Sequence, residues 1–167
     1  MRNRCVTILI RSLPALMLVL MLGACQTMPQ DLTSSDRDKL DRLLTLIDQR
    51  LDVATMVAQT KWNSGAPIDD PTREKQILDH LTANLKEADT VFARCFFQAQ
   101  FDAGKMIQHA LHVQWRAQAH GRFTSPPDLN RDIRPALDRI TPLLSDALRQ
   151  AAPLLQRESA WQYIQRQ

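Results

Sequence analysis

The sequence predicts an all-α protein, and its composition and its hydrophobic periodicity both indicate this. Of its 167 residues, 44% are hydrophobic and 23% charged, which is the balance of an ordinary globular domain. The chain has only four Gly and one Tyr, and it is rich in Leu, Ala, Gln and Arg, which favour helices over strands. Apolar residues recur at spacings of three and four over long stretches, as on one face of a helix. We therefore expect a single helical domain with three main helices (long, short, long) and a C-terminal helical region.

The first expected helix is long and covers residues 36–63. Its apolar positions repeat at helical spacing: Leu40, Leu43, Leu44, Ile47, Leu51, Ala54 and Ala58. Ser35 or Asp36 is placed to cap its start, and the run Asn63-Ser64-Gly65 ends it.

A shorter helix is expected from Pro71 to about residue 88, with Asp70 as its N-cap and Pro at its first position. The third, long helix is expected to follow a cap at Asp89 and to continue to about residue 120. After a loop at 124–130, the remaining chain is expected to form several short helices, since Pro135, Pro142 and Pro153 interrupt it.

The N-terminus resembles a bacterial lipoprotein signal. Three Arg lie among its first 11 residues, and the apolar run LPALMLVLML follows. The sequence Leu22-Gly23-Ala24-Cys25 resembles a lipobox, which predicts cleavage before Cys25 and acylation there. We expect residues 1–24 to be the signal, 25–35 a tether and 36–167 the helical domain. An ordinary signal peptide or a retained anchor is the alternative, but an apolar run of about 10 residues is shorter than the roughly 20 that span a bilayer.

Removal of the signal changes the charge of the protein. The precursor has 21 Lys and Arg against 18 Asp and Glu, and the signal contains three of the Arg and no acidic residue. The mature chain is therefore neutral and has no basic run, which argues against a nucleic-acid partner. Its remaining thiol, Cys95, lies beside two Phe on a helical pattern, and we expect it to be a buried structural Cys.

Polar residues interrupt the apolar stripes of the two long helices. Arg50 and Lys61 lie on one face of the first helix, three turns apart. In the third helix Gly104 and Gln108 interrupt an otherwise apolar face. Long cationic side chains often reach past such a face to water, and a buried amide often serves an interhelical hydrogen bond. Each feature taken alone therefore has a structural explanation.

Charged residues also gather at the start of the second helix. Asp70, Arg73 and Glu74 occupy its first turn. Acidic residues are favoured there by the helix dipole, and an exposed pair of Asp70 with Arg73 would contribute at most about 1 kcal/mol.

The combination of these residues resembles the active-site pattern of the all-helical chorismate mutases, most closely the exported subclass. The segments IDQRLDVATMVAQTKWNSGAPIDDPTRE and AGKMIQ contain the matching residues, within a resemblance covering most of residues 36–116. It implies conversion of chorismate to prephenate by a [3,3]-sigmatropic rearrangement, in the branch leading to Phe and Tyr. It also implies that the reaction needs no cofactor and no metal.

The resemblance implies a role for each matching residue. Arg50 and Arg73 would hold the carboxylates of the substrate, and Lys61 and Gln108 would donate to its ether oxygen. The substrate-binding residues would be Asp70, Glu74, Arg134 and, through its main chain only, Gly104. Arg134 is preferred to Arg131 because of the Pro-Ala-Leu-Asp that follows it. Gly104 departs from the Ser, Thr or Asn of relatives.

Gln108 implies a particular pH dependence. A Glu at this position must be protonated to donate, whereas an amide always donates. We therefore expect a flat rate between about pH 5 and 8. No Cys, Asp or Glu completes a metal site beside His109 and His112, which we expect to be exposed.

Two other functions share these features. One is a lyase that releases pyruvate from isochorismate in the same cationic cage, and the other is a lipid-anchored helical protein that only binds a small dianion. Gly104 favours the second. The expected location is the periplasm, anchored at Cys25, with the outer membrane favoured by Gln26. The sequence is compatible with a homodimer but does not decide it.

Overall fold

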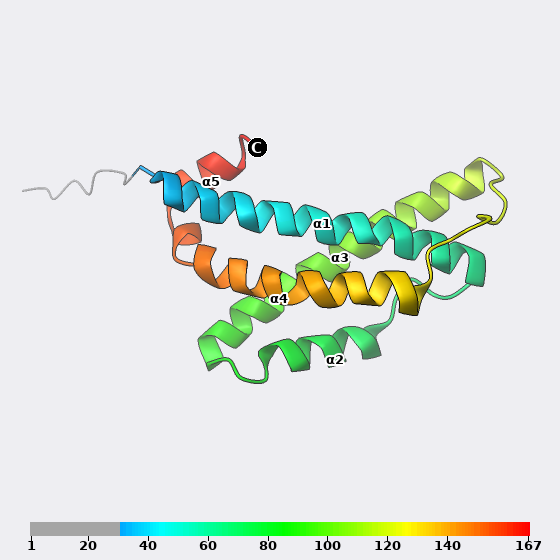
Figure 1. The fold of residues 1–167 in the computed structure, drawn as a ribbon, viewed down its shortest axis with the longest axis horizontal. Coiled ribbons are helices and arrows are strands. Elements are labelled where there is room, and N and C mark those ends of the chain that lie inside the picture. Colours follow the sequence, from blue (N-terminus) through cyan, green and yellow to red (C-terminus); the bar gives the residue numbers. More distant parts are fainter. Residues whose placement is uncertain (1–30) are drawn as a thin grey trace, which may run out of the picture.

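A computed structural model describes residues 31–167 of the chain. Within that range the protein consists of helices and loops and contains no strand (Figure 1). None of the helices in residues 31–167 is both long enough and apolar enough to cross a membrane. The predicted signal peptide and Cys25 lie outside the described residues.

The first helix, α1, spans Ser34–Ser64, close to the expected 36–63. Its cap is Thr33 and not Ser35 or Asp36. The Thr33 hydroxyl accepts from the Asp36 backbone N–H at 3.1 Å, and the Asp36 carboxylate accepts from the Thr33 N–H at 3.2 Å. This capping box satisfies two free backbone donors at once. The helix ends as predicted at Gly65, whose φ of 70° is left-handed and suits glycine.

The second helix, α2, spans Pro71–Thr82, and the third, α3, spans Glu87–Ala117. Asp70 caps α2 as predicted, but the helix ends about six residues earlier than expected. The predicted cap of α3 at Asp89 is wrong, because the helix already starts after Lys86, which is extended. A short turn between the two helices lets α3 fold back along α2.

The C-terminal region contains fewer breaks than its prolines predicted. A π-helical turn at Leu129–Ile133 leads into α4, Arg134–Ala151, which continues through Pro142. The exposed Pro142 removes one backbone donor, but Ile140 before it packs against the core and Leu144 after it is fully buried there. Packing therefore holds the helix together across the proline. A 3₁₀ turn, Leu154–Gln156, and α5, Glu158–Ile164, complete the chain.

The core lies where α1, α3 and α4 meet. In Figure 1, α4 runs beside α1, α3 crosses them at an angle, and α5 lies next to the first turns of α1. Helix α2 packs on α3, so α1 and α2 are not neighbours over their length. The largest side chains that are fully buried come from these three helices and the turn before α4: Leu40, Phe97, Ile133 and Leu144.

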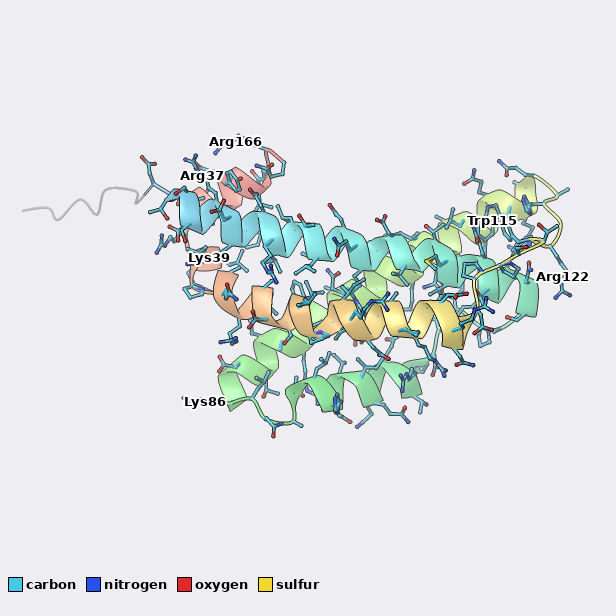
Figure 2. The ribbon with its side chains drawn as sticks, in the orientation of Figure 1. Arg37, Lys39, Lys86, Trp115, Arg122 and Arg166 are labelled. Atoms are coloured by element: carbon cyan, nitrogen blue, oxygen red, sulfur yellow. The ribbon has the colours of Figure 1, made fainter. Side chains whose placement is uncertain are left out.

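The C-terminal end of α1 holds the loop between α3 and α4 in place. Trp62 Nε1 donates to the Gly121 carbonyl at 3.0 Å, and Asn63 exchanges two hydrogen bonds with the Phe123 backbone. Figure 2 shows this end at Trp115 and Arg122, opposite Arg37 and Arg166. The expectation that His112 is exposed is wrong, because it is half-buried with Nε2 2.9 Å from the Ala58 carbonyl oxygen.

The expectation that Cys95 is buried is also wrong, because the residue is exposed. Of the two Phe that follow Cys95, Phe97 is the fully buried one. Two residues along a helix correspond to about 200° of rotation, so Cys95 lies on the opposite face of α3.

Candidate active site

A cavity of about 660 Å³ lies between α2 and α4, with α1 and α3 forming its floor. All eight residues predicted from the sequence to catalyse or bind substrate line it: Arg50, Lys61, Asp70, Arg73, Glu74, Gly104, Gln108 and Arg134. They come from four separate parts of the chain, and the fold brings them to one place.

Arg50 lies on α1 in the interior of this cavity. Its Nη1 donates to Thr141 Oγ1 on α4 at 3.3 Å, and its guanidinium stands 5.3 Å from the ring centre of Phe101. Burial lowers the pKa of Arg50, although an Arg remains charged at any ordinary pH. Among residues 31–167 no carboxylate forms an ion pair with it. A half-buried cation without a protein counter-ion is suited to an anionic ligand.

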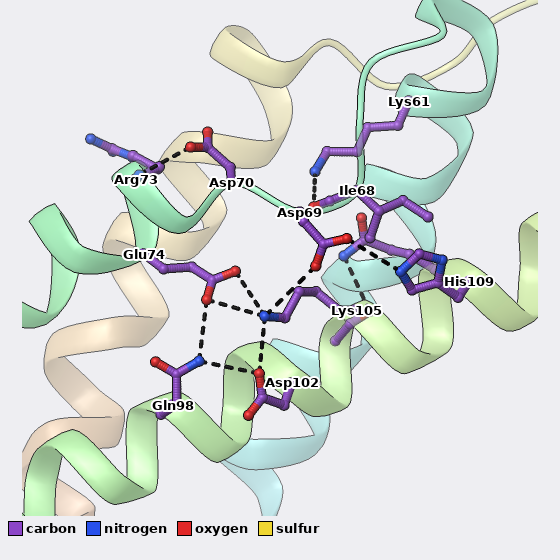
Figure 3. Close-up of polar contacts among 12 residues, drawn as sticks. Lys61, Ile68, Asp69, Asp70, Arg73, Glu74, Gln98, Asp102, Lys105 and His109 are labelled. Atoms are coloured by element: carbon purple, nitrogen blue, oxygen red, sulfur yellow. Dashed lines mark hydrogen bonds and ion pairs between the residues drawn. The ribbon is translucent and has the colours of Figure 1, made fainter.

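Lys61 lies three turns further along the same face of α1. Its Nζ donates to the carbonyl of Ile68 at 2.7 Å, which turns the ammonium toward the start of α2 (Figure 3). Burial lowers the pKa of Lys61, and the nearby carboxylates of Asp70, Asp69 and Glu74 offset part of that effect. An ammonium has three N–H donors, so Lys61 keeps two for a ligand.

The first turn of α2 places Arg73 at the rim of the cavity. The Asp70 carboxylate accepts from the Arg73 backbone N–H at 3.0 Å, which fixes the start of the helix. The Arg73 side chain is exposed and forms no ion pair within the described chain. Figure 3 shows it pointing away from Lys61. The structure therefore places Arg73 at the edge of the cavity, with its guanidinium directed away from Lys61.

Glu74 points into a polar cluster on α3 that the sequence pattern did not reveal. Its carboxylate lies 3.1 Å from Lys105 Nζ and accepts from Gln98 Nε2 at 3.2 Å (Figure 3). Lys105 also lines the cavity. It directly follows Gly104 in the matched segment AGKMIQ, and that adjacency is the signal that could have identified it.

Gln108 is buried, with 7% of its surface exposed. Its Nε2 donates to the carbonyl of Gly104 at 3.1 Å, one turn earlier on α3, and its Oε1 has no partner among the described residues. The amide keeps one N–H for a ligand. Gly104 is also buried, but a Cβ there would meet Ala54 at 3.8 Å, an ordinary contact. The space beside Gly104 therefore does not itself require glycine.

Arg134 is the first residue of α4, and its Nη1 donates to Asn130 Oδ1 at 2.5 Å. It is exposed at the edge of the cavity. Arg131 instead pairs with its neighbour Asp132 at 3.1 Å and does not line the cavity. The geometry thus agrees with the preference for Arg134.

The charges around the cavity do not balance. Its lining contains five cationic residues, which are Arg50, Lys61, Arg73, Lys105 and Arg134. It contains three acidic residues, which are Asp70, Glu74 and Asp138. The residues that line the cavity therefore have a formal net charge of +2, whereas residues 31–167 as a whole are neutral, with 18 Lys and Arg against 18 Asp and Glu. Within residues 31–167 no group of three His, Cys, Asp or Glu side chains is arranged to hold a metal ion.

Known proteins resemble this chain in sequence and in fold. Residues 37–109 match the family described as chorismate mutase type II. A secreted chorismate mutase of Mycolicibacterium smegmatis is 31% identical over 125 residues, which are 74% of this chain and 68% of that protein. The chain belongs to the chorismate mutase type II family. The match to the family ends at residue 109, one residue after Gln108.

Further matches agree with this membership. A secreted chorismate mutase of Mycobacterium tuberculosis is 31% identical over 108 residues, 62% of this chain and 54% of that protein. The crystal structure of a chorismate mutase from Burkholderia thailandensis superposes with a TM-score of 0.64 and 41% identity, over 70% of this chain and 74% of that one.

Three predictions from the sequence are therefore confirmed: the family, the all-α fold, and the assignment to the isomerases as a chorismate mutase. The two mycobacterial relatives are described as secreted, which supports the prediction that this protein is exported.

Proposed function

We propose that the cavity between α2 and α4 binds chorismate and rearranges it to prephenate. The observation that supports this best is Arg50, a half-buried cation with no carboxylate partner among the described residues, inside a cavity of net charge +2. Chorismate has two carboxylates and two negative charges, which match that excess.

The reaction makes few chemical demands on the protein. One C–O bond of the substrate breaks while a C–C bond forms, within one molecule and without proton transfer. The enzyme has to hold the chair-like conformer that brings the reacting ends together. It also has to stabilise the negative charge that develops on the ether oxygen as the C–O bond lengthens. Fixed donors in a half-buried cavity meet both demands.

We assign the carboxylates of the substrate to the arginines. Arg50 is oriented by Thr141 and Phe101, and a guanidinium binds a carboxylate through two parallel hydrogen bonds. Arg73 and Arg134 lie at opposite rims of the cavity, on α2 and α4. In this proposal the Arg73 side chain turns toward the substrate, since its guanidinium is directed away from Lys61 in the structure.

Lys61 and Gln108 are assigned to the ether oxygen. Each has one donor engaged by a backbone carbonyl and at least one more free for a ligand. They come from α1 and α3, so they can approach the oxygen from two sides. Asp70 and Glu74 are assigned to the ring hydroxyl, and Gly104 to a main-chain contact.

A single chain supplies every residue of the proposed site. A homodimer, with which the sequence is compatible, is therefore not needed to complete it.

We also propose that the chain is processed as a lipoprotein, with residues 1–24 removed, Cys25 acylated and residues 25–35 forming a tether to the domain at 36–167. The lipid would hold the enzyme in the periplasm at the outer membrane. Mass spectrometry of the N-terminal peptide tests the acylation. Expressed with its signal, a Cys25→Ala variant should leave the membrane fraction, and its retention there would contradict the proposal.

The activity is tested with the mature chain, by following the loss of chorismate absorbance and identifying the product. We expect prephenate from the wild type and a loss of about 100- to 1,000-fold in kcat/KM for Arg50→Ala. Arg131→Ala is the matched control, because it removes an exposed Arg that does not line the cavity. Absence of chorismate turnover would refute the assignment, and release of pyruvate from isochorismate would indicate the lyase.

A further inference from the structure

Two residues of α3 hold the carboxylate of Glu74 on α2. Lys105 Nζ lies 3.1 Å from Oε1 and 3.2 Å from Oε2, so it contacts both oxygens. Gln98 Nε2 donates to Oε2 at 3.2 Å. The side chains of Glu74 and Lys105 are only 17% and 20% exposed. This pair is therefore better shielded from solvent than the other Lys or Arg ion pairs of the described chain.

Lys105 itself is surrounded by acidic groups. Besides Glu74, its ammonium contacts Asp102 at 3.0 Å and lies 4.0 Å from Asp69 (Figure 3). The pKa of Lys105 is raised, first by its hydrogen bond with Asp102 and also by Glu74. Its donors are thus used within the protein. Arg50 differs, since no described carboxylate contacts it. We therefore assign binding of the substrate to Arg50 and not to Lys105.

We propose that Lys105 is a positioning residue, which holds the Glu74 carboxylate in a fixed orientation at the substrate cavity. The inference rests on the proposed function, in which Glu74 accepts a hydrogen bond from the ring hydroxyl of chorismate. It adds a residue outside the pattern that identified the site, and it gives this residue a role in substrate recognition.

The electrostatics explain why Glu74 needs such a partner. A carboxylate beside a dianionic substrate is repelled by it, and the repulsion favours a rotamer that turns the Glu74 side chain away from the substrate. A cation in contact with both oxygens offsets the repulsion without contacting the substrate.

The charged groups near the pair come from three elements. Lys61 lies on α1, Asp69, Asp70 and Arg73 lie at the start of α2, and Asp102 and His109 lie on α3. His109 Nε2 stands 3.7 Å from Asp69 and does not contact Glu74. Lys105 is the cation in contact with the Glu74 carboxylate among them.

A second ion pair between α2 and α3 provides a structural control. Arg94 Nη2 donates to Asp79 Oδ1 at 2.5 Å, one turn beyond Glu74 and outside the cavity. If Lys105 only docks α2 on α3, its removal should resemble the removal of Arg94. If Lys105 orients Glu74, only its own removal should affect substrate binding.

The test is steady-state kinetics on chorismate with five forms of the mature enzyme: Lys105→Met, Lys105→Arg, Glu74→Gln, the double variant Lys105→Met/Glu74→Gln, and Arg94→Met. The ring hydroxyl takes no part in the bonds that change, so loss of its contact should raise KM and leave kcat nearly unchanged. We expect KM to rise by about 10- to 100-fold in Lys105→Met and in Glu74→Gln. Lys105→Arg should retain most of the affinity.

The double variant decides whether Lys105 acts through Glu74. Its KM should equal that of Glu74→Gln alone, since Lys105 then has no carboxylate to orient. Arg94→Met should lower the melting temperature about as much as Lys105→Met while KM stays at the wild-type value. An unchanged KM in Lys105→Met, additive losses in the double variant, or an equal rise of KM in Arg94→Met would overturn the inference. A wild type that is inactive on chorismate would instead refute the proposed function.

Discussion

Arg50 on α1 and Thr141 on α4 are joined by a hydrogen bond of 3.3 Å between Nη1 and Oγ1, across 91 residues of sequence. This bond connects Arg50 to α4, the helix that forms one wall of the cavity. It fixes the direction of a guanidinium that has no ion pair within the described chain. The hydroxyl of Thr141 therefore supports the site, although it did not belong to the predicted pattern.

Thr141→Val should lower kcat/KM by about 2- to 10-fold, the usual net value of one hydrogen bond. The change is nearly isosteric, but it removes the acceptor of the Arg50 N–H. Thr141→Ser, which keeps the hydroxyl, is the control and should stay close to the wild type. Equal kinetics for the Val variant and the wild type would show that Phe101 alone orients Arg50.

Arg73→Ala should reduce turnover by at least about 100-fold, because it removes a cation assigned to a carboxylate of the substrate. Its α-helical circular dichroism should stay unchanged, since the side chain is exposed and holds no other residue. Asp69→Asn is the control on the same turn: Asp69 is 66% exposed and does not line the cavity. Loss of activity in Asp69→Asn, with none in Arg73→Ala, would exclude Arg73 from the site.

The rate of the wild type should be flat between about pH 5 and 8, because an amide at Gln108 donates at any pH. Gln108→Glu tests this directly. The new carboxyl can donate only when protonated, so the activity of the variant should rise as the pH falls. A steep fall of the wild-type rate toward neutral pH would contradict the role of Gln108.

On the alkaline side we expect Lys61 to limit the activity. Burial is the largest influence on its pKa, which lies below the ordinary value of 10.5. Only the protonated form can donate, so activity should be complete below the lowered pKa and lost as the pH rises through it. In Lys61→Arg the remaining activity should not fall in that range, since an Arg stays charged. A similar alkaline fall in wild type and variant would assign it to another group.

Gly104→Ala should stabilise the protein by about 0.5–1 kcal/mol, the helix propensity that glycine lacks in a helix interior. The new Cβ would meet Ala54 at an ordinary 3.8 Å, so no clash opposes the gain. Thermal unfolding measures the effect. A lower melting temperature would show that the backbone at Gly104 cannot accept a side chain.

Short-range features of the chain were predicted correctly. The end of α1 at Gly65 and the cap of α2 at Asp70 depend on residues within one turn of the helix end, so the local sequence contains the whole signal. The same is true of the face shared by Arg50 and Lys61, because the helix repeat alone sets it. Thr33 was missed as the cap of α1 because Ser and Asp beside it have the same chemistry.

The errors occurred where packing outweighs local preference. Pro142 was expected to break a helix, but α4 continues through it because Ile140 before it and Leu144 after it both pack in the core. Cys95 was expected inside beside two Phe, but the angle at which α3 packs leaves its face exposed. His112 was expected outside, yet it packs against Trp62 and the Ala58 carbonyl of α1.

By itself, the sequence determined an all-α chain, the positions of its long helices, and the set of polar residues that identify the family. Only the tertiary structure decided that Thr141 orients Arg50, that Lys105 holds Glu74, and that the Arg73 guanidinium is directed away from Lys61. Helical spacing fixes which residues of one helix share a face, because it depends on a repeat of 3.6 residues. Contacts between helices depend on the angles and distances at which they pack, and these result from the whole core rather than from any local stretch of sequence.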